Sequence, residues 1–88
     1  MSSDDSNGSD ILALNALVWV LAEPDRAERF LALTGLNGDD IRGRITDPAL
    51  LDGVLAFLEA HEPDLVACAR ALEVQPSILV SARSRLSH

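Results

Sequence analysis

The sequence predicts an all-α protein that folds as a compact bundle of five to six short helices. Hydrophobic residues make up 48% of the chain but aromatic residues only 3%, so the core must consist mainly of Leu, Ile, Val and Ala. Such a core favours packed helices over sheets. Apolar residues also recur at helical spacing in segment after segment, whereas no segment alternates with the period of two that a half-buried strand requires.

The first nine residues differ from the rest of the chain in composition. After Met1 they are Ser, Asp, Asn and Gly, with no apolar side chain among them. A segment of this kind cannot bury enough surface to offset the entropy lost on ordering. We therefore expect a disordered acidic tail over residues 1–9 and a single helical domain over residues 10–88.

The first expected helix is apolar on several sides. Every residue from 11 to 22 is apolar except Asn15. At 100° per residue, one stripe of this helix consists of Ile11, Leu14, Val18 and Leu21, with Leu17 beside it. Leu12 and Trp19 extend the apolar surface to the other side of the helix. We expect such a helix to be central in the domain or to be partly covered by another molecule.

Four proline dipeptides mark further helix starts. Proline is favoured at the first helical position, and the residue before each proline here is Glu, Asp or Gln, whose side chain can accept hydrogen bonds. Asp47 is the best N-cap among them, and Asn37 caps a short additional helix. Gly35 stands where a left-handed residue ends a helix. The expected helices begin near residues 10, 24, 38, 48, 63 and 76.

Several stretches resemble a known family. The most specific is RFLALTGL, residues 29–36, and the resemblance covers roughly residues 12–86. The chain resembles a small bacterial family catalogued as domain of unknown function thirty-five seventy-two. This resemblance implies a short helical protein from a Gram-negative bacterium, and it implies no activity and no catalytic residue. The stretches that carry it are residues 25–36, 40–42, 47–51 and 54–58.

The sequence offers little material for catalysis or metal binding. It contains one cysteine and two histidines, and neither Lys nor Tyr. Cys68 lies among alanines and is expected to be a small buried hydrophobic residue, while His61 is expected to end a helix. No motif exposes a nucleophile, cradles a phosphate or has zinc-ligand spacing. We therefore predict a protein that is not an enzyme, with no catalytic, cofactor-binding or metal-binding residue and no cofactor.

The net charge of −7 restricts the partners of the protein. Fourteen acidic residues against seven basic ones repel nucleic-acid phosphates and anionic membranes at long range. A single cysteine excludes an internal disulfide, and no apolar run is long enough to span a bilayer. These features predict a cytoplasmic protein without a membrane segment, and they argue against a nucleic-acid partner.

One pattern nevertheless favours DNA binding. Residues 63–86 read as helix, tight turn and helix, which resembles a helix-turn-helix unit. If its second helix entered a major groove, the residues able to reach bases or phosphates would include Ser77, Ser81, Arg83 and Arg85. Against this, Glu73 occupies the turn position at which such units usually have Gly, and the segment has no excess of basic residues.

The first helix supports a different function. Its apolar surface is larger than an 88-residue bundle easily covers, and an exposed apolar patch marks a site for a partner. Leu12, Trp19 and Phe57 are the candidate anchors, because large side chains dominate buried contacts. We therefore expect a non-enzymatic adaptor or protein–protein interaction module with an unidentified protein partner, and a homodimer is the simplest form. The alternative is a helix-turn-helix regulator that uses the 63–86 helix pair.

Overall fold

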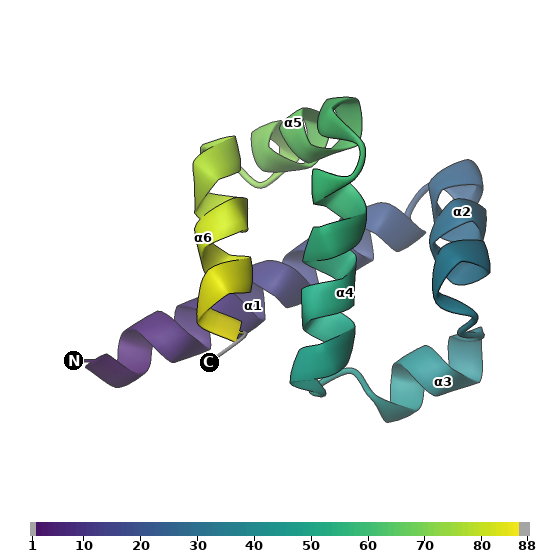
Figure 1. Cartoon of the computed structure of the whole chain (residues 1–88), viewed down its shortest axis with the longest axis horizontal. Helices are drawn as coiled ribbons and strands as arrows, with labels where there is room; N and C mark the ends of the chain where they lie inside the picture. The colour runs from purple at the N-terminus through teal and green to yellow at the C-terminus, as the bar shows by residue number, and fades with distance from the viewer. Residues whose placement is uncertain (1, 87–88) are drawn as a thin grey trace.

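The computed structural model describes residues 2–86, with side chains described for residues 8–86 (Figure 1). Over this range the chain forms α-helices and no strand, so the all-α prediction is confirmed. The helices are α1 (Ser2–Leu21), α2 (Pro24–Thr34), α3 (Gly38–Gly43), α4 (Pro48–Glu59), α5 (Glu62–Ala71) and α6 (Pro76–Leu86).

The prolines begin the helices as expected. Helices α2, α4 and α6 each start at a proline, and α5 starts one residue before Pro63. The side chain of Asp47 accepts a hydrogen bond from the backbone N–H of Ala49 at 2.9 Å, which confirms it as the N-cap of α4. Glu23 and His61 occupy the corresponding positions of α2 and α5 without forming a side-chain cap.

Local signals also fix the short segment between α2 and α4. Gly35 has a φ of 72°, and its N–H donates to the carbonyl of Leu31, so α2 ends in a left-handed residue. Asn37 and Asp40 then form a capping box, in which each side chain accepts a hydrogen bond from the backbone N–H of the other residue. Helix α3 therefore begins where the sequence predicts.

The start of α1 differs from the expectation. The helix begins at Ser2, whereas the sequence predicted a start near residue 10. The sequence argument considered only apolar burial, whereas Ser9 is 3% exposed and lies at the edge of the core. A helix nucleated by the packed residues extends at the cost of fixing one residue at a time. Met1, Ser87 and His88 lie outside the described residues, and the division into a tail at 1–9 and a domain at 10–88 stays a prediction.

Helices α1, α4 and α6 form the centre of the molecule. Helices α4, α5 and α6 follow one another around three sides of a frame, and α1 passes behind α4 and α6 (Figure 1). The most extensive packing is that of α1 with α6, of α1 with α4, and of α4 with α6. Helix α2 packs against the end of α1 and against α4. Helix α1 is therefore central, as expected, although only one of its sides faces the other helices.

The core consists mostly of aliphatic side chains. Helix α4 is the most deeply buried element and contributes Leu50, Leu51, Val54, Leu55, Phe57 and Leu58. Phe30 from α2 is fully buried, and its ring meets that of Phe57 edge to face, with centroids 5.4 Å apart at 80°. Aromatic pairs favour this geometry. The pair fixes α2 against α4.

We expect Phe30→Ala to lower the free energy of unfolding by about 3–5 kcal/mol, because it removes a buried ring and leaves a cavity beside Phe57. Urea unfolding followed by circular dichroism measures the change. Leu33→Ala is the matched control, since Leu33 lies on the same helix and is 74% exposed. Equal effects of the two substitutions would contradict this packing of α2.

Candidate interaction surface

Helix α1 packs through a face of small residues. Ala13, Ala16, Leu17 and Val20 are each at most 1% exposed. The two alanines carry little side-chain volume, so α4 and α6 can both lie close to the α1 backbone. Because this face is rotated away from the stripe that begins at Ile11, the chain covers the alanine side of α1 and leaves the other side open.

The uncovered side of α1 carries large apolar residues. Ile11 is 59% exposed, Val18 62% and Leu21 37%, and Leu14 between them is half-buried and packs in part against the core. We call these four residues the α1 seam. Scattered exposed apolar residues are ordinary on a protein surface, but four along one helix face form a continuous strip. The seam is therefore the largest apolar feature that α1 presents to solvent.

A shallow groove widens the seam on one side. It has a volume of about 110 Å³ and lies between α1 and the segment that joins α3 to α4. Its wall opposite α1 includes Ile45, which is 42% exposed. The lining residues are Asp10, Ile11, Leu14, Ile45, Thr46 and Leu51. An apolar side chain of a partner could enter this groove while the partner contacts the seam.

The partner-binding residues expected from the sequence lie elsewhere. Leu12 and Trp19 are half-buried and pack against the core, and Phe57 is only 8% exposed. The structure does not bring the three side chains together on one exposed patch. Most of the surface of Phe57 is already covered by the chain itself, and Ile11 and Val18 are more exposed than any of the three. Binding through Leu12, Trp19 and Phe57 stays a prediction.

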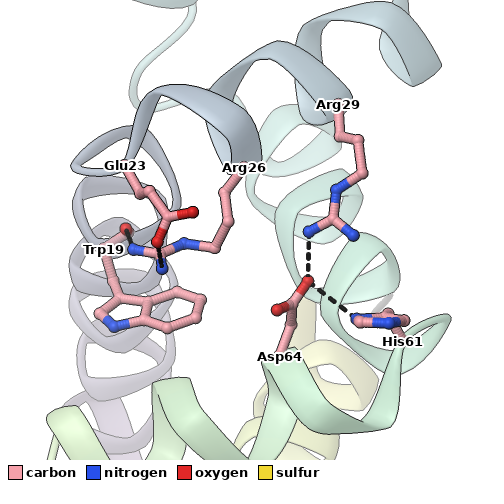
Figure 2. Close-up of polar contacts among 6 residues, drawn as sticks. All are labelled: Trp19, Glu23, Arg26, Arg29, His61 and Asp64. Carbon is pink, nitrogen blue, oxygen red and sulfur yellow. Dashed lines mark hydrogen bonds and ion pairs between the residues drawn. The ribbon is translucent and has the colours of Figure 1, made fainter.

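Trp19 is covered in part by a cation. The guanidinium of Arg26 lies 3.6 Å from the ring centroid, and Figure 2 shows it stacked on the indole. The same guanidinium donates to the Trp19 carbonyl at 2.7 Å and forms an ion pair with Glu23 at 2.8 Å. The Arg26 side chain is 16% exposed, so these interactions act in a partly desolvated site. They join the end of α1 to the first turn of α2 and close one face of Trp19.

A second polar cluster joins α2 to α5. One carboxylate oxygen of Asp64 accepts a hydrogen bond from Arg29 at 2.6 Å and lies 3.0 Å from Nδ1 of His61 (Figure 2). His61 is also the N-cap residue of α5. The sequence had suggested that it ends the preceding helix. Arg29 also lies over the ring of Phe57 at 5.5 Å. The Asp64 side chain is 15% exposed and receives both partners, so the cluster serves to hold α5 against α2.

The expected DNA-contact residues divide into two groups. Ser77, Ser81 and Arg85 are exposed on α6. Arg83 instead turns toward α4, where it forms ion pairs with Asp52 at 3.0 Å and Glu59 at 3.2 Å. Its hydrogen bond to Asp52 and the two nearby carboxylates raise the pKa of the Arg83 guanidinium. The charge of Arg83 is therefore already compensated within the chain.

The turn before α6 does resemble that of a helix-turn-helix unit. Glu73 has a φ of 59°, the left-handed conformation that Gly usually supplies at this position. The N–H of Glu73 donates to the Arg70 carbonyl and that of Val74 to the Ala69 carbonyl, which is a complete Schellman motif. Helices α5 and α6 bend by 99° at this junction, within the range for such units.

Cys68 lies inside the helical core. It is 0% exposed, and burial raises the pKa of its thiol from 9.0 to about 11, with small opposing effects of Arg26 and Asp64. A thiol held protonated in this way is a poor nucleophile at neutral pH. The expectation of a buried hydrophobic cysteine is confirmed for its position in the structure.

The described residues contain neither a metal cluster nor a single spanning helix. In the part of the chain with described positions, no group of three or more His, Cys, Asp or Glu side chains could hold a metal ion. No single helix between residues 2 and 86 is long and apolar enough to cross a membrane. Among the described helices, only α5 and α6 taken together reach that length and composition, and they are bent by 99° where they meet.

The sequence showed the apolar stripe that forms the seam, but it did not show which face of α1 the other helices cover. Large apolar residues at helical spacing indicate a buried face, and small residues carry little weight in such a pattern. The signal that could have located the buried face is the pair Ala13 and Ala16, since helices approach one another most closely at alanine. The anchors Leu12 and Trp19 were chosen for size, and size does not show which side the other helices cover.

We expect native Cys68 to react slowly with a disulfide reagent at about pH 8, because the thiol is buried and protonated. In urea it should react at the rate of a free cysteine. Since the folded-state pKa lies above 9.0, the folded protein binds this proton more tightly than the unfolded chain. This contribution to stability is complete below pH 9 and is lost as the pH rises toward 11. Rapid reaction of the native protein would contradict the placement of Cys68.

Comparison with known proteins identifies the family of the chain. The family model described as Protein of unknown function (DUF3572) matches residues 6–88. Neither a curated protein nor a solved structure matches the chain. The matched range is longer than the resemblance over residues 12–86 that the sequence stretches indicated. Because the family model covers nearly the whole sequence, the chain belongs to the DUF3572 family.

Proposed function

We propose that this member of the DUF3572 family is a non-enzymatic, cytoplasmic protein-interaction module that binds a helical segment through the α1 seam. The observation that supports the proposal most directly is the exposure of Ile11 and Val18, 59% and 62%, on the helix that is otherwise central to the core. An amphipathic helix binds by laying its apolar face against a complementary apolar surface, as in grooves and coiled-coil zippers. The adjoining groove with Ile45 would accept one further side chain.

The support comes from the contrast between the seam and the other exposed apolar residues. Leu33 is 74% exposed but is the only large apolar residue of α2 exposed to that degree. Val66, Ile78 and Val80 are each 38–45% exposed and are distributed over α5 and α6. The seam, by contrast, places several such residues along one face of one helix. A contiguous apolar patch on a surface is typical of an interaction site, whereas single exposed apolar residues are not.

We expect Val18→Glu to abolish capture of the partner from a lysate of the native host, because it places a charge in the middle of the seam. Leu33→Glu is the matched control, since it makes the same change at a more exposed apolar position outside the seam. Both variants should keep the helical circular dichroism spectrum of the unmodified chain. Capture that is lost with both variants, or with neither, would contradict a role of the seam.

DNA binding by the α5–α6 pair is the second candidate function. The left-handed conformation of Glu73 and the 99° bend support it, together with the exposure of Ser77, Ser81 and Arg85. The net charge of −7 and the pairing of Arg83 with two carboxylates weigh against it. The interaction module is therefore the better supported function.

We expect no salt-sensitive mobility shift with duplex DNA, because the negative net charge repels phosphate. If a shift does occur, Arg85→Glu should abolish it, since Arg85 is exposed on α6. Arg83 is unsuitable for this test, because its substitution also breaks the ion pairs with α4. A specific shift that Arg85→Glu removes would favour the DNA-binding candidate over the interaction module.

A further inference from the structure

We propose that the partner of the α1 seam is a second copy of this chain, which forms a symmetric dimer by pairing the two α1 helices. This inference rests on the proposed function, since it names the occupant of the same surface. It depends on three features of the seam: the spacing of its residues, their chemical types and the groups beside them. Each of these features indicates a helix of the same kind.

The spacing of the seam is that of a coiled coil. Its residues lie at positions 11, 14, 18 and 21, so successive intervals are three, four and three residues. This is the pattern of the a and d positions of a heptad, whose side chains meet an equivalent row on a neighbouring helix. The strip is narrower than the wider apolar face with which a helix packs onto a globular core. It therefore fits a single facing helix.

The residue types favour two strands. Ile11 and Val18 occupy the a positions, and both are β-branched. Leu14 and Leu21 occupy the d positions. This combination is the one that favours two-stranded pairing in coiled coils, because each shape suits the packing angle at its position. Because every copy of the chain presents the same pattern, two copies would supply the two halves of the interface.

The residues beside the seam permit a close approach. Asn15 and Ala22 flank it on one side, and both are exposed and uncharged. Asp10 lies on the other side at the edge of the groove. Symmetric pairing brings identical patches together, so a basic or bulky residue next to the seam would oppose it. Asp10 is the charged residue of this flank, and it lies near the end of the seam, where water can still reach it.

The size of the surface also fits a weak dimer. The seam contains two a and two d positions, so pairing would bury little more than the seam and the groove. Contacts that bury less than about 1,200 Å² in total are typically weak, so association through the seam is expected to depend on concentration.

Sedimentation velocity over roughly 1 μM to 1 mM, a span that covers weak association, tests the proposal. We expect a monomer–dimer equilibrium for the unmodified chain, a monomer at every concentration for Val18→Glu, and unchanged dimerisation for Leu33→Glu. Circular dichroism checks that each variant is folded. A monomer throughout for the unmodified chain overturns the proposal, and so does a dimer that persists in Val18→Glu.

Disulfide trapping then establishes that the seams face each other. Ile11→Cys and Leu21→Cys are oxidised separately and as a mixture, with buried Cys68 as the internal unreactive thiol. Parallel pairing yields a disulfide in each variant alone, and antiparallel pairing yields one only in the mixture, because disulfides require Cα atoms within about 7 Å. Either pattern supports the proposal, and no trapping in any sample overturns it.

The two proposals fail in different ways. If the unmodified chain is monomeric but Val18→Glu still abolishes capture of a host protein, the second copy is excluded and the interaction module remains. If the chain dimerises through the seam, the seam is an interaction surface in either case. If it is monomeric and captures nothing that depends on Val18, both proposals are contradicted.

Discussion

The structure depends on the close packing of α4 and α6 against the alanine face of α1. Ala13 and Ala16 are fully buried there, and α1, α4 and α6 share the most extensive contacts of the molecule. A larger side chain at either alanine would push α4 or α6 outward, since a packed interior has no free volume to absorb it. The ion pairs of Arg83 with Asp52 and Glu59 join α6 to α4 at the rim of the same contact.

This packing explains why the chain presents an apolar strip to solvent. A helix that uses small residues for its own core can place its large ones on the opposite side. In α1 those large residues include Ile11 and Val18, which the domain does not cover. The charged residues that hold the periphery have partners within the chain: Arg26 binds Glu23 and the Trp19 carbonyl, and Arg29 binds Asp64. The seam is thus an apolar surface on a helix that the contacts described above leave open.

Much of the fold could be predicted from the sequence, because its signals are local. Proline at the first turn, the Asp47 cap, the Asn37 capping box and the left-handed Gly35 each depend on residues within four positions. The start of α1 at Ser2 and its buried face could not be predicted in this way. The buried face depends on where α4 and α6 lie, which is a tertiary property that overrides local propensity. The same reason applies to Arg83, whose two partners are 24 and 31 residues away.

The backbone at the junction between α5 and α6 is less stable than it would be with glycine at its left-handed position. Glu73 adopts a left-handed backbone conformation with a φ of 59°. In this conformation a residue with a side chain is about 1 kcal/mol higher in energy than glycine. The Schellman hydrogen bonds and the packing of Val74 nevertheless keep the bend in place. The strain at this corner is therefore offset by the contacts around it, and glycine at position 73 would relieve it.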